Sequence, residues 1–310
     1  MMDSSLISTT KENKRENNWI GRFAPSPSGQ LHFGSLIAAL GSYLIAKQNN
    51  GKWLLRIEDI DPPREVEGAA KQIIQTLENF GFEWDGEILY QSQRNLAYQQ
   101  AIDSLYQQKL IYYCKCSRKQ IQQRNQGVYD QFCLNRQIRD PLAAMRIKFN
   151  DAFSSFNDEI KGACCFSQPA DLEDFIVKRR DGLHAYQLAV VIDDIDQGVN
   201  HVVRGADLLD STPRQNFLYH LLNHQPPRYY HLPLVVDADG NKLSKSKFSP
   251  AIESHKASYY LCKALAHLGQ KVEEGYYHIS PKEILKTALQ NWQLNTVPKQ
   301  SVKHFEVNAN

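Results

Sequence analysis

The segment from Trp19 to Leu44 constrains the fold of this 310-residue chain more than any other stretch. A short run from Trp19 to Ala24 can form a strand, after which Pro25 and Pro27 impose an extended turn. Apolar residues then recur at helical spacing, at Leu36, Ile37, Leu40, Tyr43 and Leu44. The segment therefore predicts a strand, a turn and a buried helix that begins near Ser35, with free backbone N–H groups at the helix start that suit an anion.

The turn also carries groups that fit a phosphate. His32 has an imidazole that can donate to a phosphate oxygen as charge builds on the phosphorus. Gly29 and Gly34 let a nucleotide approach the backbone closely. The alternative interpretation is a tight turn that only caps a core helix.

A second segment far along the chain has matching chemistry. Lys242 and Lys245 flank Ser244 and Ser246, directly after residues 237–241, whose composition favours a sharp turn with a mobile tip. Such a loop can close over a triphosphate and offset its negative charge, chiefly through Lys245. An isolated Lys/Ser run is otherwise a solvated basic turn.

Together and in this order, the two segments resemble the nucleotide-handling signatures of class I aminoacyl-tRNA synthetases. The resemblance implies aminoacyl adenylate formation, with ATP as substrate together with Mg²⁺, and gives His32 and Lys245 the catalytic roles. It also implies a set of ATP-binding residues, which are His32, Gly34, Ser35, Lys242, Ser244, Lys245 and Ser246. The chain departs from the pattern at Ser35, where the motif ends in histidine, and at Ser28, where a threonine is common.

Two further stretches narrow the resemblance to glutamyl-tRNA synthetases. Residues 22–27 and 55–61 are similar to the glutamate-binding strand and loop of that family. A substrate with two carboxylates and one ammonium needs two cations and one anion, which Arg22, Arg204 and Glu58 would supply. The glutamate-binding residues implied by the resemblance are Arg22, Phe23, Ala24, Pro25, Ser26, Glu58, Tyr186 and Arg204. Which arginine holds which carboxylate stays open.

Residues 184–194 and 202–209 are similar to the part of that family that completes the sheet. The apolar run from Leu188 to Ile192 fits a strand buried on both faces. Tyr186 would then hydrogen-bond the amino acid, or else have only a structural partner, as buried tyrosines commonly do. Arg204 is expected at the carboxyl end of a strand, where open parallel sheets bind ligands.

Chain length separates two branches of the family. The chain ends at Asn310, which leaves too little after the 242–246 loop for an anticodon-binding domain. This layout resembles the glutamyl-Q tRNA(Asp) synthetases, and implies as partners glutamate, ATP and tRNA(Asp) carrying queuosine, with no protein partner. A minimal enzyme that charges tRNA(Glu) is one alternative. The other is a nucleotidyltransferase or ligase, or a catalytically silent RNA-binding paralogue, of the same superfamily.

A cysteine-rich patch resembles the zinc site of the same branch. Cys114 and Cys116 are followed by Tyr129 and Cys133, and the resemblance implies that these four hold one structural Zn²⁺. A tyrosine is an uncommon zinc ligand, so Cys164 or Cys165 is a rival for the fourth position. Reduced, buried cysteines without a metal are the alternative.

The predicted fold is α/β: a Rossmann-like class I synthetase catalytic domain with an inserted zinc-containing module, a short helical C-terminal region and no anticodon-binding domain. The expected parts are a disordered tail (1–18), the two catalytic halves (19–95 and 184–247), the insertion (96–183) and the helical region (248–310). Helices are expected at 258–268 and 281–292.

Composition excludes little. Hydrophobic residues at 42% and charged residues at 23% are typical of a globular protein. The absence of a signal-like or membrane-spanning run and the six cysteines lead us to expect a reducing cytoplasm and no membrane partner. Residues 242–310 contain ten lysines and five acidic residues, and this net +5 could meet tRNA phosphates or be a solvated surface.

Overall fold

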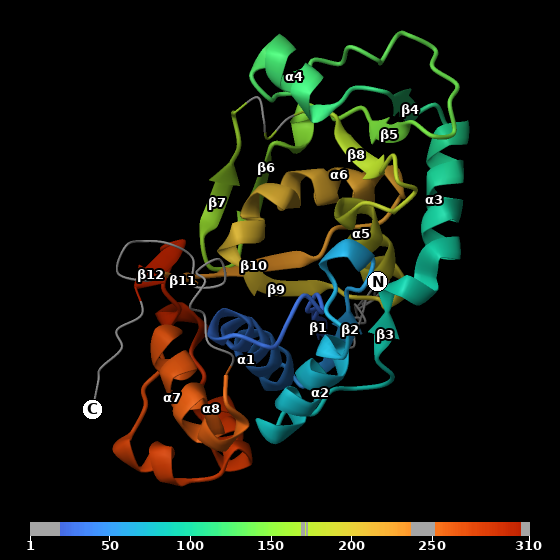
Figure 1. Cartoon of the computed structure of the whole chain (residues 1–310). Coiled ribbons are helices and arrows are strands. Elements are labelled where there is room, and N and C mark those ends of the chain that lie inside the picture. Colours follow the sequence, from blue (N-terminus) through green and yellow to red (C-terminus); the bar gives the residue numbers. More distant parts are fainter. Residues whose placement is uncertain (1–18, 169–170, 172, 237–251, 305–310) are drawn as a thin grey trace, which may run out of the picture.

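The computed structural model describes residues 19–168, 171, 173–236 and 252–304 (Figure 1). The helices within this part are α1 (Phe33–Gln48), α2 (Ala69–Asn79), α3 (Asn95–Gln107), α4 (Arg118–Asn125), α5 (Tyr186–Asp196), α6 (Thr212–Leu221), α7 (Ala257–His267) and α8 (Pro281–Asn291). The strands are β1 (Ile20–Phe23), β2 (Lys52–Ile57), β3 (Leu89–Tyr90), β4 (Ile111–Cys114), β5 (Ala144–Ile147), β6 (Ser155–Asp158), β7 (Gly162–Cys165), β8 (Phe175–Lys178), β9 (His201–Gly205), β10 (Arg228–Leu232), β11 (Leu234–Val236) and β12 (Val302–His304).

Two groups of parallel strands meet edge to edge in the middle of the molecule. One has the order β1-β2-β3, and the other has the order β7-β6-β10-β9, in which only β7 is antiparallel to its neighbour. They adjoin at β1 and β9, because the backbone of Ile20 bonds both the backbone N–H and the side chain of Asn200. The strand order therefore reverses between β1 and β9, which is where open α/β sheets bind ligands.

The predicted strand, turn and helix at the N-terminal end are confirmed. β1 covers four residues of the expected strand, and α1 begins at Phe33, two residues before the predicted start. His32 caps the helix, since its Nδ1 accepts the backbone N–H of Ser35 at 3.2 Å. After α1 the chain continues into β2, and Gly81 follows the end of α2 with a φ of +82°, which glycine tolerates best.

Helices cover both faces of the central strands (Figure 1). α1, α2, α7 and α8 share one hydrophobic core with β1 and β2, in which Leu36, Leu40 and Trp53 have no exposed surface. α3, α5 and α6 form a second core with a small antiparallel sheet of order β4-β5-β8. The helices expected at 258–268 and 281–292 correspond to α7 and α8, which pack on α1.

The strand predicted around Leu188 to Ile192 is wrong, because these residues belong to α5. Every residue from Leu188 to Asp194 is buried, so this helix is enclosed on all sides. A continuous apolar run is shared by buried helices and buried strands, and periodicity cannot separate them. Tyr186 consequently stands at the start of a helix.

The small sheet and α4 lie at the far end of the molecule from α7 and α8 (Figure 1). β6 and β7, which fall within the expected insertion at 96–183, instead extend the central strands through the pairing of Asp158 with Tyr229. No helix in the described ranges is long and apolar enough to cross a membrane.

Candidate functional site

A cleft of about 790 Å³ opens where β1 and β9 end. It collects residues from both halves of the chain, and all eight residues expected to bind glutamate line it: Arg22, Phe23, Ala24, Pro25, Ser26, Glu58, Tyr186 and Arg204. The backbone hydrogen bond from Glu58 to Pro25, 3.0 Å long, ties the loop after β2 to the turn after β1. The two sequence stretches thus form one wall.

Arg22 is buried at the end of β1 and is held by a carboxylate on α5. Its Nε lies 3.1 Å from Asp194 Oδ1, and the same oxygen accepts from Arg56 on the adjacent strand. Burial disfavours the Asp194 carboxylate, but the two arginines outweigh burial and hold the pKa of Asp194 below its usual range. Within the described residues, Arg22 is bonded to Asp194 through Nε, on the side of the guanidinium that leaves Nη1 and Nη2 for a ligand in the cleft. This edge of the guanidinium suits a carboxylate.

Glu58 and Tyr186 both line the cleft, and the charge of Glu58 acts on the Tyr186 phenol. Burial raises the pKa of Glu58 to about 7, although Arg56 and Arg22 act to lower it. Burial likewise raises the pKa of the Tyr186 phenol, so this group stays neutral and can donate. Because its pKa lies near neutrality, Glu58 would lose its proton readily when a cationic ligand binds beside it.

Arg204 at the end of β9 is held by four partners. Its Nε donates to His231 Nε2 at 3.0 Å, Nη1 donates to Gln215 at 2.7 Å, and Nη2 donates to Thr212 at 2.8 Å and to the Leu208 carbonyl at 3.2 Å. The side chain is 4% exposed. Two buried arginines and a carboxyl group in one cleft match a ligand with two negative groups and one positive group.

Three of the residues expected to bind ATP lie on the same cleft. His32, Gly34 and Ser35 line it at the start of α1, and His32 Nε2 is 3.0 Å from the Ser35 hydroxyl. A Cβ atom at Gly34 would lie 3.2 Å from the His32 ring, so a side chain here would crowd the imidazole and require it to shift slightly. The remaining expected residues, Lys242, Ser244, Lys245 and Ser246, lie outside the described residues.

The residues behind the cleft could not be predicted from the sequence. Asp194 anchors Arg22, while Asp158 and His231 lie behind Arg204. The sequence holds one local sign of them: Asp193 and Asp194 end the buried run of α5. Buried carboxylates are rare unless paired, so these two acids indicate cationic partners nearby. Nothing in the sequence relates Asp158 to His231.

The three expected cysteine ligands form one cluster. The sulfurs of Cys114, Cys116 and Cys133 lie within 4.8 Å of one another, and those of Cys116 and Cys133 are 3.4 Å apart. The Tyr129 hydroxyl accepts the backbone N–H of Cys133 at 3.1 Å, and Tyr129 also acts to lower the pKa of the Cys114 thiol. The rivals Cys164 and Cys165 belong to β7, in a different sheet.

Two arginines border this cluster. Arg124 donates from Nη2 to Cys116 Sγ at 3.3 Å, and the guanidinium carbon of Arg146 lies 3.8 Å above the centre of the Tyr129 ring. Burial disfavours the Cys114 thiolate, but hydrogen bonds from Tyr129 and Arg146 help to bring the pKa of Cys114 below its usual value. The group has the ligand types and the positive surroundings of an anionic metal site.

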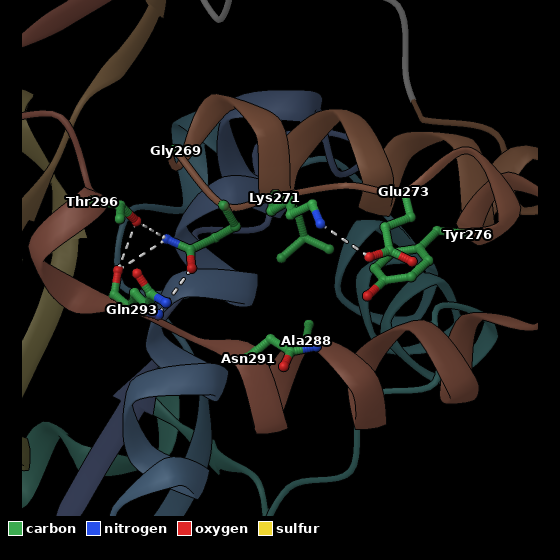
Figure 2. Close-up of a pocket in the computed structure, with 10 residues that line it drawn as sticks. Gly269, Lys271, Glu273, Tyr276, Ala288, Asn291, Gln293 and Thr296 are labelled. Atoms are coloured by element: carbon green, nitrogen blue, oxygen red, sulfur yellow. Dashed lines mark hydrogen bonds and ion pairs between the residues drawn. The ribbon is translucent and has the colours of Figure 1, made fainter.

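A second hollow of about 310 Å³ lies between α7 and α8 (Figure 2). Gln270 bridges its wall, donating to the Gln293 carbonyl and to the Thr296 hydroxyl and accepting from the Gln293 N–H. Lys271 pairs with Glu273 at 3.3 Å. None of the expected site residues lines this hollow, so the chemistry is concentrated in the cleft at the sheet.

Comparisons with known proteins place the chain in a family of tRNA synthetases. A family model described as "tRNA synthetases class I (E and Q), catalytic domain" matches residues 20–302. Proteins named glutamyl-Q tRNA(Asp) synthetase are similar throughout: that of Pseudomonas entomophila is 50% identical over 92% of this chain and 96% of its own length. That of Escherichia coli O157:H7 is 48% identical over 93% of each chain.

A solved structure shares the fold. The glutamate tRNA ligase of Elizabethkingia meningosepticum, crystallised in complex with its amino acid, superposes with a TM-score of 0.76 at 25% identity. The match covers 93% of this chain and 67% of that chain.

Proposed function

Because this chain belongs to the glutamyl-Q tRNA(Asp) synthetases, within the catalytic-domain family of class I tRNA synthetases, we propose that it activates glutamate with ATP and transfers it to the queuosine base of tRNA(Asp). The reaction would take place in the cytoplasm. In the first step a carboxylate oxygen of glutamate attacks the α-phosphorus of ATP, and pyrophosphate leaves. In the second step an acceptor group on queuosine attacks the carbonyl carbon, and AMP leaves.

One observation carries this proposal: Arg22, Glu58 and Arg204 share a cleft with His32, at the point where the strand order reverses. The two arginines would bind the two carboxylates of glutamate, and Glu58 would bind its ammonium. Tyr186 would donate to the amino acid. These groups hold the substrate beside the start of α1, where a triphosphate fits.

His32 and the first turn of α1 would handle the phosphate. The neutral imidazole has its proton on Nε2 when Nδ1 accepts from the Ser35 N–H, and Nε2 then donates to the Ser35 hydroxyl. A bound phosphate oxygen would take the place of that hydroxyl as acceptor. Gly34 leaves room for the His32 ring, which a side chain at this position would crowd. Lys245 is proposed to offset the charge of the leaving pyrophosphate.

Pyrophosphate exchange and transfer assays test the proposal. Exchange should depend on glutamate and should discriminate by about 10⁴-fold against glutamine, which lacks the second carboxylate. Transfer should require tRNA(Asp) with queuosine, and the same tRNA without queuosine is the matched control. Charging of tRNA(Glu) instead would favour the minimal-synthetase alternative, and an absence of glutamate-dependent exchange would refute both.

We also propose that the cluster holds one structural Zn²⁺, with Cys114, Cys116 and Cys133 as thiolate ligands and Tyr129 as the fourth. Tetrahedral Zn–S bonds of about 2.3 Å put sulfurs about 3.8 Å apart, and the sulfurs here are already within 4.8 Å. The metal would fasten β4 to the loop after α4, because its ligands come from both.

Charge supports this ligand set. Three thiolates and a phenolate around Zn²⁺ leave a net charge of −2, which Arg124 and Arg146 can balance from the positions they occupy. Metal analysis of the purified protein tests the assignment. One zinc per chain is expected, and retention of full zinc in Tyr129→Phe would exclude the phenolate as a ligand.

A further inference from the structure

Three buried polar side chains on neighbouring strands form a chain that ends at the cleft. His231 on β10 accepts from Arg204 on β9 at 3.0 Å, and its other ring nitrogen is 2.7 Å from Asp158 on β6. Asp158 and His231 are 1% and 0% exposed. Neither lines the cleft, so any effect on a ligand has to pass through Arg204.

The protonation of this chain follows from its chemistry. Arginine has only donors, so His231 Nε2 has to accept, and the neutral ring then carries its proton on Nδ1 and donates it to Asp158. Burial lowers the pKa of His231 to about 4, although Asp158 opposes this, which agrees with a neutral ring.

Asp158 is saturated with donors. One carboxylate oxygen accepts the backbone N–H groups of Ile160 and Lys161 at 3.0 and 2.8 Å, and the other accepts both the backbone N–H and the ring of His231. The orientation of the His231 ring is therefore set by the turn at residues 158–161, and none of these residues lines the cleft.

Resting on the proposed function, we propose that Asp158 and His231 are positioning residues for glutamate, because they fix the plane of the Arg204 guanidinium that meets a substrate carboxylate. The His231 bond is the one that Arg204 Nε makes within the described part of the chain. Without it the guanidinium is held through Nη1 and Nη2 alone, by Gln215, Thr212 and the Leu208 carbonyl, and its plane can tilt about these bonds. Preorganised donors of this kind bind more tightly than mobile ones.

His231→Phe is the most direct test. It keeps a ring of similar size and leaves Asp158 its three backbone bonds, while the acceptor for Arg204 is lost. In glutamate-dependent pyrophosphate exchange, the KM for glutamate should rise by about 3- to 10-fold, the range for having to immobilise one flexible side chain on binding. The KM for ATP should stay within about twofold, because His32 and Gly34 do not depend on this chain.

Asp158→Asn is the second variant. An amide has one oxygen and one NH₂ group, so it cannot accept from both pairs of donors. If its NH₂ group faces the ring, the ring proton moves to Nε2 and opposes Arg204, as in other Asp–His pairs altered in this way. The same selective rise in the KM for glutamate is expected.

Asp85→Asn serves as the control for general destabilisation. Its carboxylate also accepts a backbone N–H, that of Trp53 at 2.7 Å, but it has no contact with Arg204. It should leave both KM values unchanged. A folded His231→Phe protein whose KM for glutamate changes by less than threefold, or whose two KM values rise equally, would overturn the positioning role. Failure of the wild-type protein to activate glutamate would instead refute the proposed function.

Discussion

Glutamate activation should depend on pH through Glu58. Burial raises the pKa of this carboxyl group to about 7, and only its ionised form can bind the substrate ammonium. Below the pKa, the ionised fraction falls by about tenfold per pH unit, so kcat/KM for glutamate should be about one-tenth of its plateau at pH 6 and about one-hundredth at pH 5. Above pH 8 it should be constant, since the group is then fully ionised.

The assay is glutamate-dependent pyrophosphate exchange between pH 5 and 8.5, with kcat/KM determined separately for glutamate and for ATP. Glu58→Gln is the matched variant, because it keeps the shape of the side chain and cannot ionise. It should have a low and pH-independent kcat/KM for glutamate. A wild-type profile that stays flat down to pH 5.5, or an equal slope in Glu58→Gln, would refute the reasoning.

The same pKa has the opposite consequence for stability. A carboxyl group whose pKa rises from 4.5 unfolded to about 7 folded costs stability as pH increases between these values. At about 1.36 kcal/mol per pK unit the upper limit is about 3 kcal/mol, and the partial exposure of Glu58 to solvent reduces this to about 1–2 kcal/mol. Glu58→Gln should therefore unfold at a higher temperature than the wild type at pH 8 and at the same temperature near pH 4.

The remaining predictions concern other parts of the molecule. Asp194→Asn leaves two buried arginines without their anion and should lower the free energy of unfolding by about 3–5 kcal/mol in denaturant titrations. His32→Ala should slow pyrophosphate exchange by about 10²- to 10³-fold, and a loss of only a few-fold would contradict its phosphate role. Cys133→Ser should reduce the zinc content by metal analysis and lower the melting temperature. Neutralising Lys282 and Lys286 should weaken tRNA binding more than adenylate formation, and equal losses would count against an RNA-binding surface.

Secondary structure could be predicted from the sequence where one hydrophobic repeat or one turn motif determined it. The strand, turn and helix around His32 and the capped helix α8 could be placed because prolines, glycines and capping residues act within a few positions of themselves. The buried run of α5 could not be identified as a helix in this way. A helix that is apolar on all sides has no amphipathic repeat, because other elements surround it.

What the sequence by itself determined is the set of chemical groups: arginines, a carboxyl group and an imidazole of the right kinds, in an order that identifies the family. What only the tertiary structure decided is their charge states and orientations. Arg22 depends on Asp194, which is 172 residues away, and Arg204 depends on Asp158 through His231. The physical reason is that burial and the nearest opposite charge set a pKa and a rotamer, and both are created when distant strands and helices meet.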